Sequence, residues 1–269
     1  MKERYYYSIG SGSTGNCGLY VCGGTAILID LGVSVRRITA ALRKRGFEIA
    51  DLSGVLITHG HHDHIKGLST FVKRYRVPIY ASRGTAEELV RKDPAAQALL
   101  RPFWGGETFD VGSLQVESFL TPHDAAESVG YVLRGEGDAF GYATDLGFMP
   151  SAIKSKLLGC GAVVLESNHD LVMLETGPYP YILKQRVSGP RGHLSNVDCA
   201  ACAAELVKNG TKTLILAHLS EENNTPSLAQ KETEDALTGL PDCAVYVAPR
   251  DEMEEPVWLS EEMQCSLYV

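Results

Sequence analysis

The sequence lacks the features that mark membrane-spanning, secreted and disordered chains. No apolar run approaches the roughly 20 residues of a membrane-spanning helix, and the opening residues, MKERYYYSIG, contain no apolar core of a signal peptide. No Pro/Gly/Ser-rich linker divides the 269 residues, of which 44% are hydrophobic and 22% charged. We therefore expect one cytoplasmic domain over residues 1–269 with no membrane contact. The composition gives no indication of the oligomeric state.

Paired cysteines are also lacking. The seven cysteines are odd in number and scattered along the chain, which predicts reduced thiols. Cys199 and Cys202 form a CxxC motif, but the alanine-rich pattern around them, NVDCAACAAELVKNG, is typical of a helix. No second Cys/His pair stands at a spacing typical of zinc sites. The pattern therefore favours two buried small residues on one helix face.

Positive charge is scarce, with a net charge of -8, whereas nucleic-acid-binding proteins usually carry a basic surface. The excess is confined to an acidic C-terminal segment, residues 221–269, with twelve Asp/Glu against two Lys/Arg. Basic groups remain upstream at 36–37, 43–45 and 73–76, where we expect solvated helix or loop faces. A further group, Lys184, Arg186 and Arg191, lies close to His193 and is a candidate for contact with a phosphate chain.

The order of the expected elements indicates the fold class. Short strands joined by glycine-rich turns fill residues 4–31, and an amphipathic helix follows over 34–47 with Ser34 as its N-cap. A buried strand (GVLIT), a helix and further strands lead to the middle of the chain, where a polar loop precedes a helix over 195–208. Two such meander, helix and strand runs predict an α/β protein, a four-layer αββα sandwich with helices outside two mixed sheets.

The most specific motif is HGHHDH, residues 59–64, directly after the buried strand GVLIT. Its imidazole and carboxylate donors lie between a strand and a helix, so they can converge on one point while the backbone is held. Zinc, manganese and iron all accept such donors. One loop cannot complete two coordination spheres, so other donors are needed.

Three further residues follow predicted apolar strands, where a sheet delivers side chains to a common edge: His123, Asp145 and His218. Each alone would suggest a surface or capping role, but together with the motif they favour a two-metal site, with the cations about 3.5–4 Å apart. The expected ligands of one metal are His59, His61 and His123, and those of the other are Asp63, His64 and His218, with Asp145 bridging the two. Asp30 is a candidate acceptor that orients a ligand imidazole, or equally a turn or capping aspartate.

This set of residues resembles the metallo-β-lactamase superfamily, whose αββα fold matches the layers inferred above. Asp145 stands where true β-lactamases usually carry a cysteine, and it resembles the bridging carboxylate of the hydrolase and nuclease branches. Together with SGSTGNC (11–17), the segments LESNHD (165–170), GHLSN (192–196) and LILAHLS most resemble the YycJ/WalJ group. That resemblance implies 5′-to-3′ exonuclease activity on DNA. Only 47 residues separate Asp145 from His193, too few for the large inserted domain of β-CASP nucleases, so we expect an accessible site.

The resemblance also implies a mechanism with named roles. A hydroxide that bridges two divalent metals, zinc or manganese and less commonly iron, attacks the phosphodiester, and Asp63 orients or deprotonates it. His193 donates to the phosphate or leaving oxygen and is oriented by Glu166. Substrate contacts are expected from His193, Arg191 and the helix start at Ser195 and Asn196. We expect no direct role for His62 or His169.

Three alternatives remain open at this point. A thioester or lactone hydrolase of glyoxalase II type would use the same ligands, although GHLSN with its upstream basic residues suits a phosphate better. An RNA-processing endonuclease is the second alternative, with DNA favoured over RNA as the nucleic-acid partner. The third is a silent binding module, which the crowded donors argue against, because unused buried polar groups cost stability.

Overall fold

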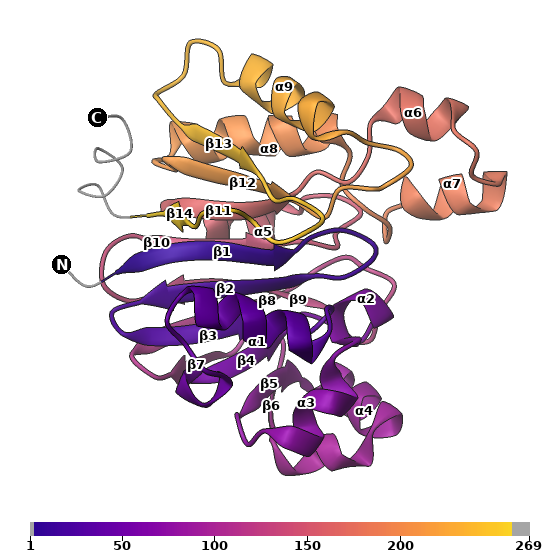
Figure 1. Cartoon of the computed structure of the whole chain (residues 1–269). Coiled ribbons are helices and arrows are strands. Elements are labelled where there is room, and N and C mark those ends of the chain that lie inside the picture. Colours follow the sequence, from indigo (N-terminus) through magenta and orange to yellow (C-terminus); the bar gives the residue numbers. More distant parts are fainter. Residues whose placement is uncertain (1–2, 260–269) are drawn as a thin grey trace.

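The computed structural model describes residues 3–259, in which two seven-stranded mixed sheets pack face to face (Figure 1). The strands of the first sheet, in spatial order, are β14 (Val257–Trp258), β1 (Arg4–Gly10), β2 (Cys17–Cys22), β3 (Thr25–Ile29), β4 (Gly54–Ile57), β5 (Ile79–Ser82) and β6 (Leu100–Phe103). Those of the second are β13 (Ala244–Val247), β12 (Thr213–Ala217), β11 (Cys160–Glu166), β10 (Ala139–Ala143), β9 (Val129–Arg134), β8 (Leu114–Leu120) and β7 (Thr108–Val111).

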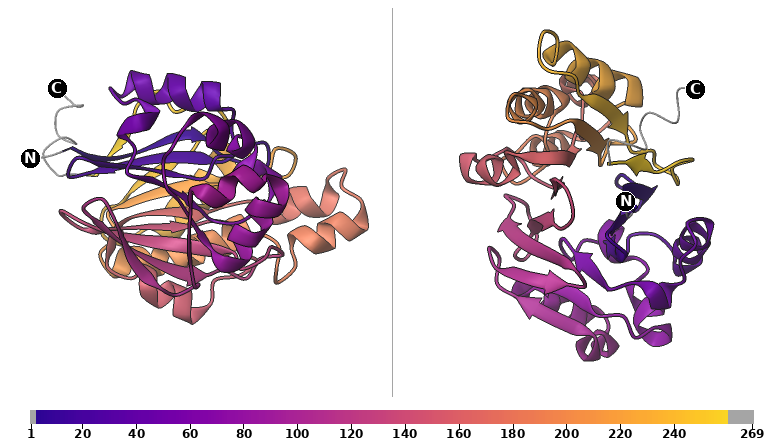
Figure 2. Two further views of the ribbon diagram at one scale, coloured as in Figure 1. Left: turned by 90° about the horizontal axis from the view of Figure 1, so that it is seen from below. Right: turned by 90° about the vertical axis from the view of Figure 1, so that its left-hand side faces the viewer.

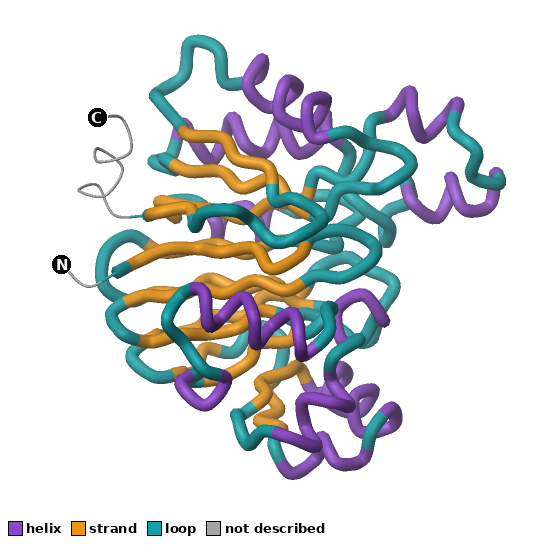
Figure 3. The backbone as a smooth tube through the Cα atoms, viewed as in Figure 1, coloured by secondary structure: helices purple, strands orange, loops and turns teal. Residues whose placement is uncertain are grey.

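Helices cover the outer face of each sheet (Figures 2 and 3). Those that share a core with the first sheet are α1 (Val35–Lys44), α3 (Leu68–Arg74) and α4 (Arg83–Lys92). Those that pack on the second are α5 (Ser151–Leu157), α8 (Asn196–Lys208) and α9 (Pro226–Ala236). Short helical turns lie at η1 (Ile49–Asp51), α2 (His62–Ile65) and η2 (Pro94–Ala98). The predicted four-layer αββα sandwich is confirmed.

Three apolar layers follow from this arrangement, and alternation along β1 illustrates them. Tyr5 and Tyr7 point to the helices outside the first sheet, whereas Tyr6 points between the sheets. There the Tyr20 and Phe140 rings stack with their centroids 4.5 Å apart, a contact worth about 0.5–1.5 kcal/mol beyond the area that it buries. Because both faces of the central strands are covered, these strands are apolar on both faces.

The cysteines and the first helix agree with the sequence prediction. Cys199 and Cys202 are buried thiols on α8, and no disulfide joins any two cysteines within residues 3–259. Cys265 lies outside the described residues. Helix α1 begins after Ser34, whose hydroxyl accepts a hydrogen bond from the Arg37 amide. No helix in the described part of the chain combines the length and hydrophobicity needed to cross a bilayer.

Part of the acidic C-terminal segment pairs with α1. The contacts are Arg37 Nη1 to Asp251 Oδ1 at 3.2 Å, Lys44 Nζ to Glu252 Oε1 at 2.9 Å and Arg45 Nη1 to Glu255 Oε2 at 3.2 Å. Each pair is partly exposed and contributes about 0–1 kcal/mol. The basic residues at 36–37 and 43–45 were expected to be solvated, but Arg37, Lys44 and Arg45 have carboxylate partners from this segment.

The polar loop predicted before the 195–208 helix is wrong in part, because it contains two short helices, α6 (Leu171–Thr176) and α7 (Tyr181–Val187). They project from the body of the sandwich (Figure 1). Helix α6 begins after Asp170, whose side chain accepts a hydrogen bond from the Met173 amide. None of the residues of α7 is buried. A helix without a core-facing stripe has no apolar periodicity to reveal it in the sequence.

One edge of the sandwich gathers the carboxyl ends of strands from both sheets. Strands β3 and β4 run parallel in the first sheet, and β10, β11 and β12 run parallel in the second. Asp30, Asp145 and His218, which follow β3, β10 and β12, have left-handed backbones with φ of 65°, 59° and 58°. Such strained residues cost about 1–3 kcal/mol each and are found mainly at functional sites.

Gly32 marks the tightest packing at this edge. A Cβ on Gly32 would lie 1.7 Å from the Asp63 carbonyl oxygen and 2.4 Å from the Asn16 nitrogen. Those two atoms are themselves joined by a hydrogen bond of 2.7 Å. Three loops therefore meet where only a glycine fits.

We expect Gly32→Ala to lower the free energy of unfolding by about 3 kcal/mol, because the added methyl must displace backbone. Urea unfolding monitored by circular dichroism measures the loss. The matched variant is Gly24→Ala in the β2–β3 turn, which has a left-handed φ of 87° but nothing within 4 Å of the new Cβ, and we expect a cost of about 1 kcal/mol. Equal losses in the two variants would contradict the close-packing argument.

Candidate metal centre

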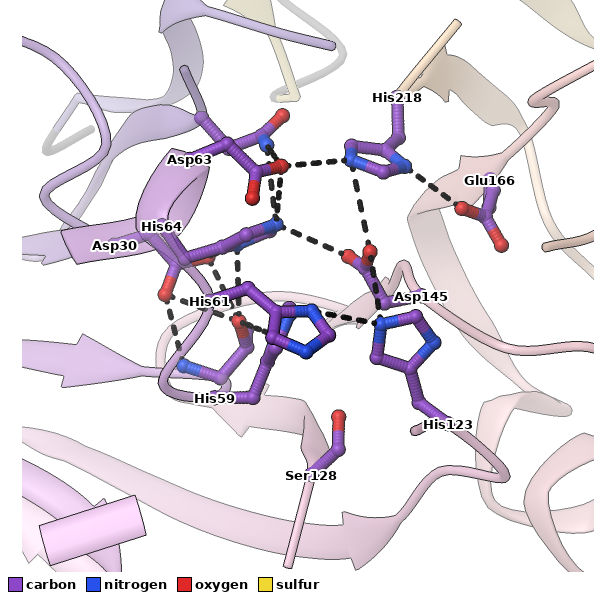
Figure 4. Close-up of polar contacts among 12 residues, drawn as sticks. Asp30, His59, His61, Asp63, His64, His123, Ser128, Asp145, Glu166 and His218 are labelled. Carbon is purple, nitrogen blue, oxygen red and sulfur yellow. Dashed lines mark hydrogen bonds and ion pairs between the residues drawn. The ribbon is translucent and has the colours of Figure 1, made fainter. Parts of the chain in front are cut away.

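The HGHHDH segment leaves the end of β4 and turns into α2, which begins at His62 inside the motif. Figure 4 shows its other His and Asp side chains gathered with His123, Asp145 and His218. His61 is the N-cap residue of α2, and Asp63 and His64 lie in its first turn. His62 is exposed, whereas His59 and His64 are fully buried. The local fold thus selects four donors from the motif and leaves His62 outside the group.

The first donor group contains His59, His61 and His123, whose ligand atoms all lie within 4.8 Å of one another. His123 Nε2 is 3.2 Å from His61 Nδ1. The other nitrogen of His123, Nδ1, lies 3.1 Å from the Gly192 carbonyl oxygen, to which it can donate. His59 Nδ1 contacts the Thr58 hydroxyl at 3.1 Å, so both imidazoles direct Nε2 to the centre.

The second donor group contains Asp63, His64 and His218. His64 Nδ1 donates to Asp30 Oδ2 at 2.8 Å, and its Nε2 lies 3.3 Å from Asp63 Oδ2. Asp30 therefore orients the imidazole of His64, a candidate ligand. His218 Nε2 is 3.4 Å from the same Asp63 oxygen.

Asp145 lies between the two groups, with Oδ1 3.7 Å from His123 Nε2 and 3.6 Å from His218 Nε2. Its Oδ2 is 3.4 Å from His64 Nε2. This carboxylate thus reaches donors of both groups, which is the position expected of a bridging ligand.

Glu166 contacts two histidines of the site, whereas the sequence predicted contact with one. Its Oε1 accepts hydrogen bonds from His193 Nδ1 and from His218 Nδ1, both at 2.8 Å. Its Oε2 accepts the Leu146 and Leu194 amides, both at 3.0 Å. The predicted contact with His193 is present, but the same oxygen also orients a candidate ligand, His218.

Asn16 and Ser11 are functional candidates that sequence reasoning missed. Asn16 Nδ2 donates to Asp63 Oδ2 at 3.1 Å and lies 3.1 Å from His64 Nε2. The Ser11 hydroxyl accepts the His218 amide at 2.8 Å. Both belong to the SGSTGN segment, which served above only as a mark of resemblance. The polar residues in that glycine-rich turn were the available signal.

The donor set fits divalent metal ions. Among the described residues, His59 Nε2 and Asp145 Oδ2 are buried without a hydrogen-bond partner, and unpaired buried polar atoms are costly unless a ligand satisfies them. Burial lowers the pKa of His59 and His123, which favours the neutral imidazole that metals bind. Imidazole with carboxylate suits zinc, manganese or iron.

Two other imidazoles of the cluster, those of His218 and His64, have raised pKa values because carboxylates surround them. Burial alone would lower the pKa of His218, but Asp145, Asp63 and Glu166 outweigh burial and raise that pKa to about 10. His64 behaves in the same way, with its pKa raised by Asp145 and Asp30 against the effect of burial. Protons on these two rings therefore balance the buried carboxylates when no cation does so.

The predicted substrate residues divide into two classes. His193 is partly exposed and lines a cavity of about 220 Å³. Ser195 and Asn196 are buried: the Ser195 hydroxyl caps α8, and the Asn196 side chain is hydrogen-bonded to Ser167 and Asn224. Their expected contact with substrate is corrected to a role in holding the loop. Arg191 is exposed and donates through Nε to the His123 carbonyl oxygen at 3.2 Å.

The cavity joins the donor groups to the region around α7. The residues that line it are Ser13, His61, Asp63, Asp145, Asn168, Tyr179, Arg186, Val187, His193, His218 and Ser220. Of the basic group near His193, Arg186 reaches this cavity, whereas Lys184 Nζ donates to the Glu175 carbonyl oxygen at 2.6 Å. A larger cavity of about 550 Å³ lies beside α4 and shares none of these residues.

Glu166 should make stability depend on pH. Burial would raise its pKa, but His193 and the hydrogen bonds from His193 and His218 outweigh burial and lower the pKa to about 2. Because the folded pKa is below the ordinary 4.5, this stabilisation is present above pH 4.5 and is lost as the pH falls toward 2.

We expect the free energy of unfolding of wild-type protein treated with EDTA to fall by on the order of 3 kcal/mol through Glu166 between pH 4.5 and pH 2. Glu166→Gln should lack this part of the decrease. Urea unfolding at pH 2 to 7 measures it. Glu175→Gln, an exposed change, should keep the wild-type slope. An unchanged slope in Glu166→Gln would contradict the assignment.

Comparison with known proteins shows the family of this chain. Residues 25–219 match the model of the beta-lactamase superfamily domain. The chain is 37% identical over 239 residues to exodeoxyribonuclease YycJ of Bacillus anthracis, an alignment that covers 87% of this chain and 89% of the relative. It is 33% identical over 229 residues to exodeoxyribonuclease WalJ of Streptococcus pneumoniae serotype 2, with 83% and 84% covered.

Solved structures show the same fold. The metallo-beta-lactamase fold protein YhfI from Bacillus subtilis superposes with a TM-score of 0.71, covering 93% of this chain and 98% of that chain at 16% identity. The chain therefore belongs to the metallo-β-lactamase superfamily of hydrolases and, within it, to the YycJ/WalJ family.

Proposed function

We propose that this protein is a phosphodiester hydrolase with two divalent metal ions that removes nucleotides from DNA in the 5′-to-3′ direction. The observation that carries the proposal is the position of His193. Its Nδ1 is fixed by Glu166 at 2.8 Å, and the ring lines the cavity beside Asp63 and Asp145. His193 also lies close enough to Asp145 and His218 to be a metal donor, but its Nδ1 is bonded to Glu166, so Nε2 is available to a bound phosphate.

The proposed ligands are His59, His61 and His123 for one ion, Asp63, His64 and His218 for the other, and Asp145 between them. When bound, the ions neutralise phosphate charge and lower the pKa of a coordinated water toward neutrality. Zinc and manganese both suit the donors, and iron is chemically acceptable.

Asp63 would orient the attacking water by accepting a hydrogen bond from it. Burial would raise the pKa of Asp63, but His64 and His218 outweigh burial and hold that pKa well below its usual range. The carboxylate is therefore ionised, and Asn16 fixes one of its oxygens at 3.1 Å. This arrangement supports a positioned acceptor that faces the cavity.

His193 would stabilise charge on the phosphate and protonate the leaving oxygen. Glu166 accepts a hydrogen bond from Nδ1, which leaves Nε2 free for a bound phosphate. Arg191 and Arg186 add positive charge on the same side of the site. Polarity and preference for DNA rest on the resemblance and on the names of the two relatives, both exodeoxyribonucleases.

Metal content tests the ligand assignment. We expect His61→Ala to reduce bound metal from two ions to about one per chain, because it removes one of three ligands of the first group. Mass spectrometry of protein loaded with Zn²⁺ or Mn²⁺ and then desalted measures the ratio. His62→Ala, its exposed neighbour, should retain both ions, and two ions in both variants would refute the assignment.

His193→Ala should lower kcat about 10²–10³-fold, since removal of one general acid or charge donor has effects of this size. Metal content should stay at the wild-type value, because His193 belongs to neither triad. Steady-state rates on 5′-phosphorylated DNA, with His62→Ala as the control, measure the effect. Full turnover in His193→Ala would exclude the proposed role.

The substrate class can be tested on one preparation of protein loaded with zinc or manganese. End-labelled 5′-phosphorylated DNA, the matching RNA and S-lactoylglutathione are supplied in parallel. We expect mononucleotides released from the 5′ end of DNA as the main product. Internal cuts in RNA would instead favour an RNA-processing endonuclease, and turnover of the thioester alone would favour a glyoxalase II-like hydrolase.

A further inference from the structure

We infer that Tyr179 and Arg186 form a nucleotide subsite beside the metal centre, in which the Tyr179 ring packs on the terminal base and Arg186 binds a phosphate of that nucleotide. This inference rests on the proposed function and specifies the form of its substrate. It assigns a role to α7 and the segment before it, because α7 lacks the buried residues expected of an element that serves only to stabilise the fold.

The cavity brings the two residues to the site. Tyr179, Arg186 and Val187 line the same 220 Å³ space as Asp63, Asp145 and His193. Val187 accepts the His193 amide through its carbonyl oxygen at 2.8 Å. The end of α7 and the candidate acid are therefore held together by the backbone, so a group bound at α7 is placed relative to His193.

Arg186 is engaged by a weak partner that a phosphate can replace. Its Nε donates to Asp124 Oδ2 at 2.7 Å, with relative exposures of 59% for the arginine and 31% for the aspartate side chain. Exposed ion pairs contribute only about 0–1 kcal/mol. The planar guanidinium matches two phosphate oxygens at once, so exchange of Asp124 for a phosphate costs little.

The Tyr179 ring can stack on a base of any identity. The ring is half-buried in the cavity wall, between Pro178 and Pro180. Prolines on both sides restrict the backbone of this short segment, which limits the positions that the ring can take. Stacking on an aromatic ring tolerates any base.

The size of the cavity favours a single unpaired nucleotide. Its 220 Å³ is below the roughly 300–1,000 Å³ of typical drug-sized ligand sites, so it has no room for a base pair, and one nucleotide at a chain end would lie partly within it. The substrate class inferred is therefore the terminal, unpaired nucleotide of a DNA strand that carries a phosphate.

The test compares two 5′-phosphorylated single strands, one of them with an abasic first residue. We expect Tyr179→Ala to raise KM about tenfold on the normal strand and to leave KM on the abasic strand unchanged, because only the base contact is lost. Tyr179→Phe, which keeps the ring, should resemble wild type. Arg186→Ala should raise KM about tenfold on both strands and weaken the salt dependence of binding.

The matched controls are Tyr181→Ala and Gln185→Ala, which change exposed residues of α7 that do not line the cavity. Both should keep wild-type kinetics. Equal effects of Tyr179→Ala on the two strands, or no effect on either, would overturn the subsite for the base. An unchanged KM in Arg186→Ala would overturn the phosphate contact.

The two levels of inference fail in different ways. If the wild-type protein releases nucleotides and the Tyr179 and Arg186 variants match it on both strands, the subsite is wrong and the proposed function stands. If the wild-type protein, loaded with zinc or manganese, degrades no DNA strand, the proposed function is wrong and the subsite falls with it.

Discussion

Buried imidazoles held at Nδ1 by fixed acceptors are the interaction on which the site depends. Asp30 holds His64, Glu166 holds His218, and the Gly192 carbonyl oxygen holds His123. Each contact sets the orientation of the ring and leaves Nε2 facing inward, as in metal sites where an outer acceptor orients the ligand. Without these acceptors the rings could rotate, and the convergence of donors from separate strands would be lost. The outer acceptors therefore determine where the inner nitrogen atoms of the site lie.

The backbone accepts strain so that these groups can converge. Asp30, Asp145 and His218 all adopt left-handed conformations directly after parallel strands. The chain must turn sharply there to keep each side chain at the edge of its sheet. Aspartate and histidine tolerate this conformation better than β-branched residues, and the hydrogen bonds that the side chains receive offset part of the cost. Rigid strands on one side and tight loops at Gly32 on the other leave little room for relaxation.

Much of this could be predicted from the sequence, and what could not be predicted has physical reasons. The layers and donors were visible because strands read as apolar runs and HGHHDH is dense in ligand types. Helix α7 was missed because it buries nothing, so no periodicity marks it. The hydrogen bond that His218 donates to Glu166 joins residues 52 positions apart. The sequence alone does not show how close the ends of two strands lie in space. Asn196 was expected to contact substrate, but its side chain is buried and bonded to Asn224. The sequence does not show that these two residues lie side by side.

A net charge of -8 does not oppose an anionic substrate, because local pairing rather than the total sets the field at the site. Several carboxylates of residues 251–255 are paired with cations of α1, which reduces their effect beyond the screening length of about 8–10 Å. At the cavity the carboxylates are different: Asp63 and Asp145 face imidazoles and would face cations when metal is bound. Divalent ions there reverse the sign of the local charge. Attraction of a phosphate chain should therefore depend on metal occupancy more than on the surface arginines.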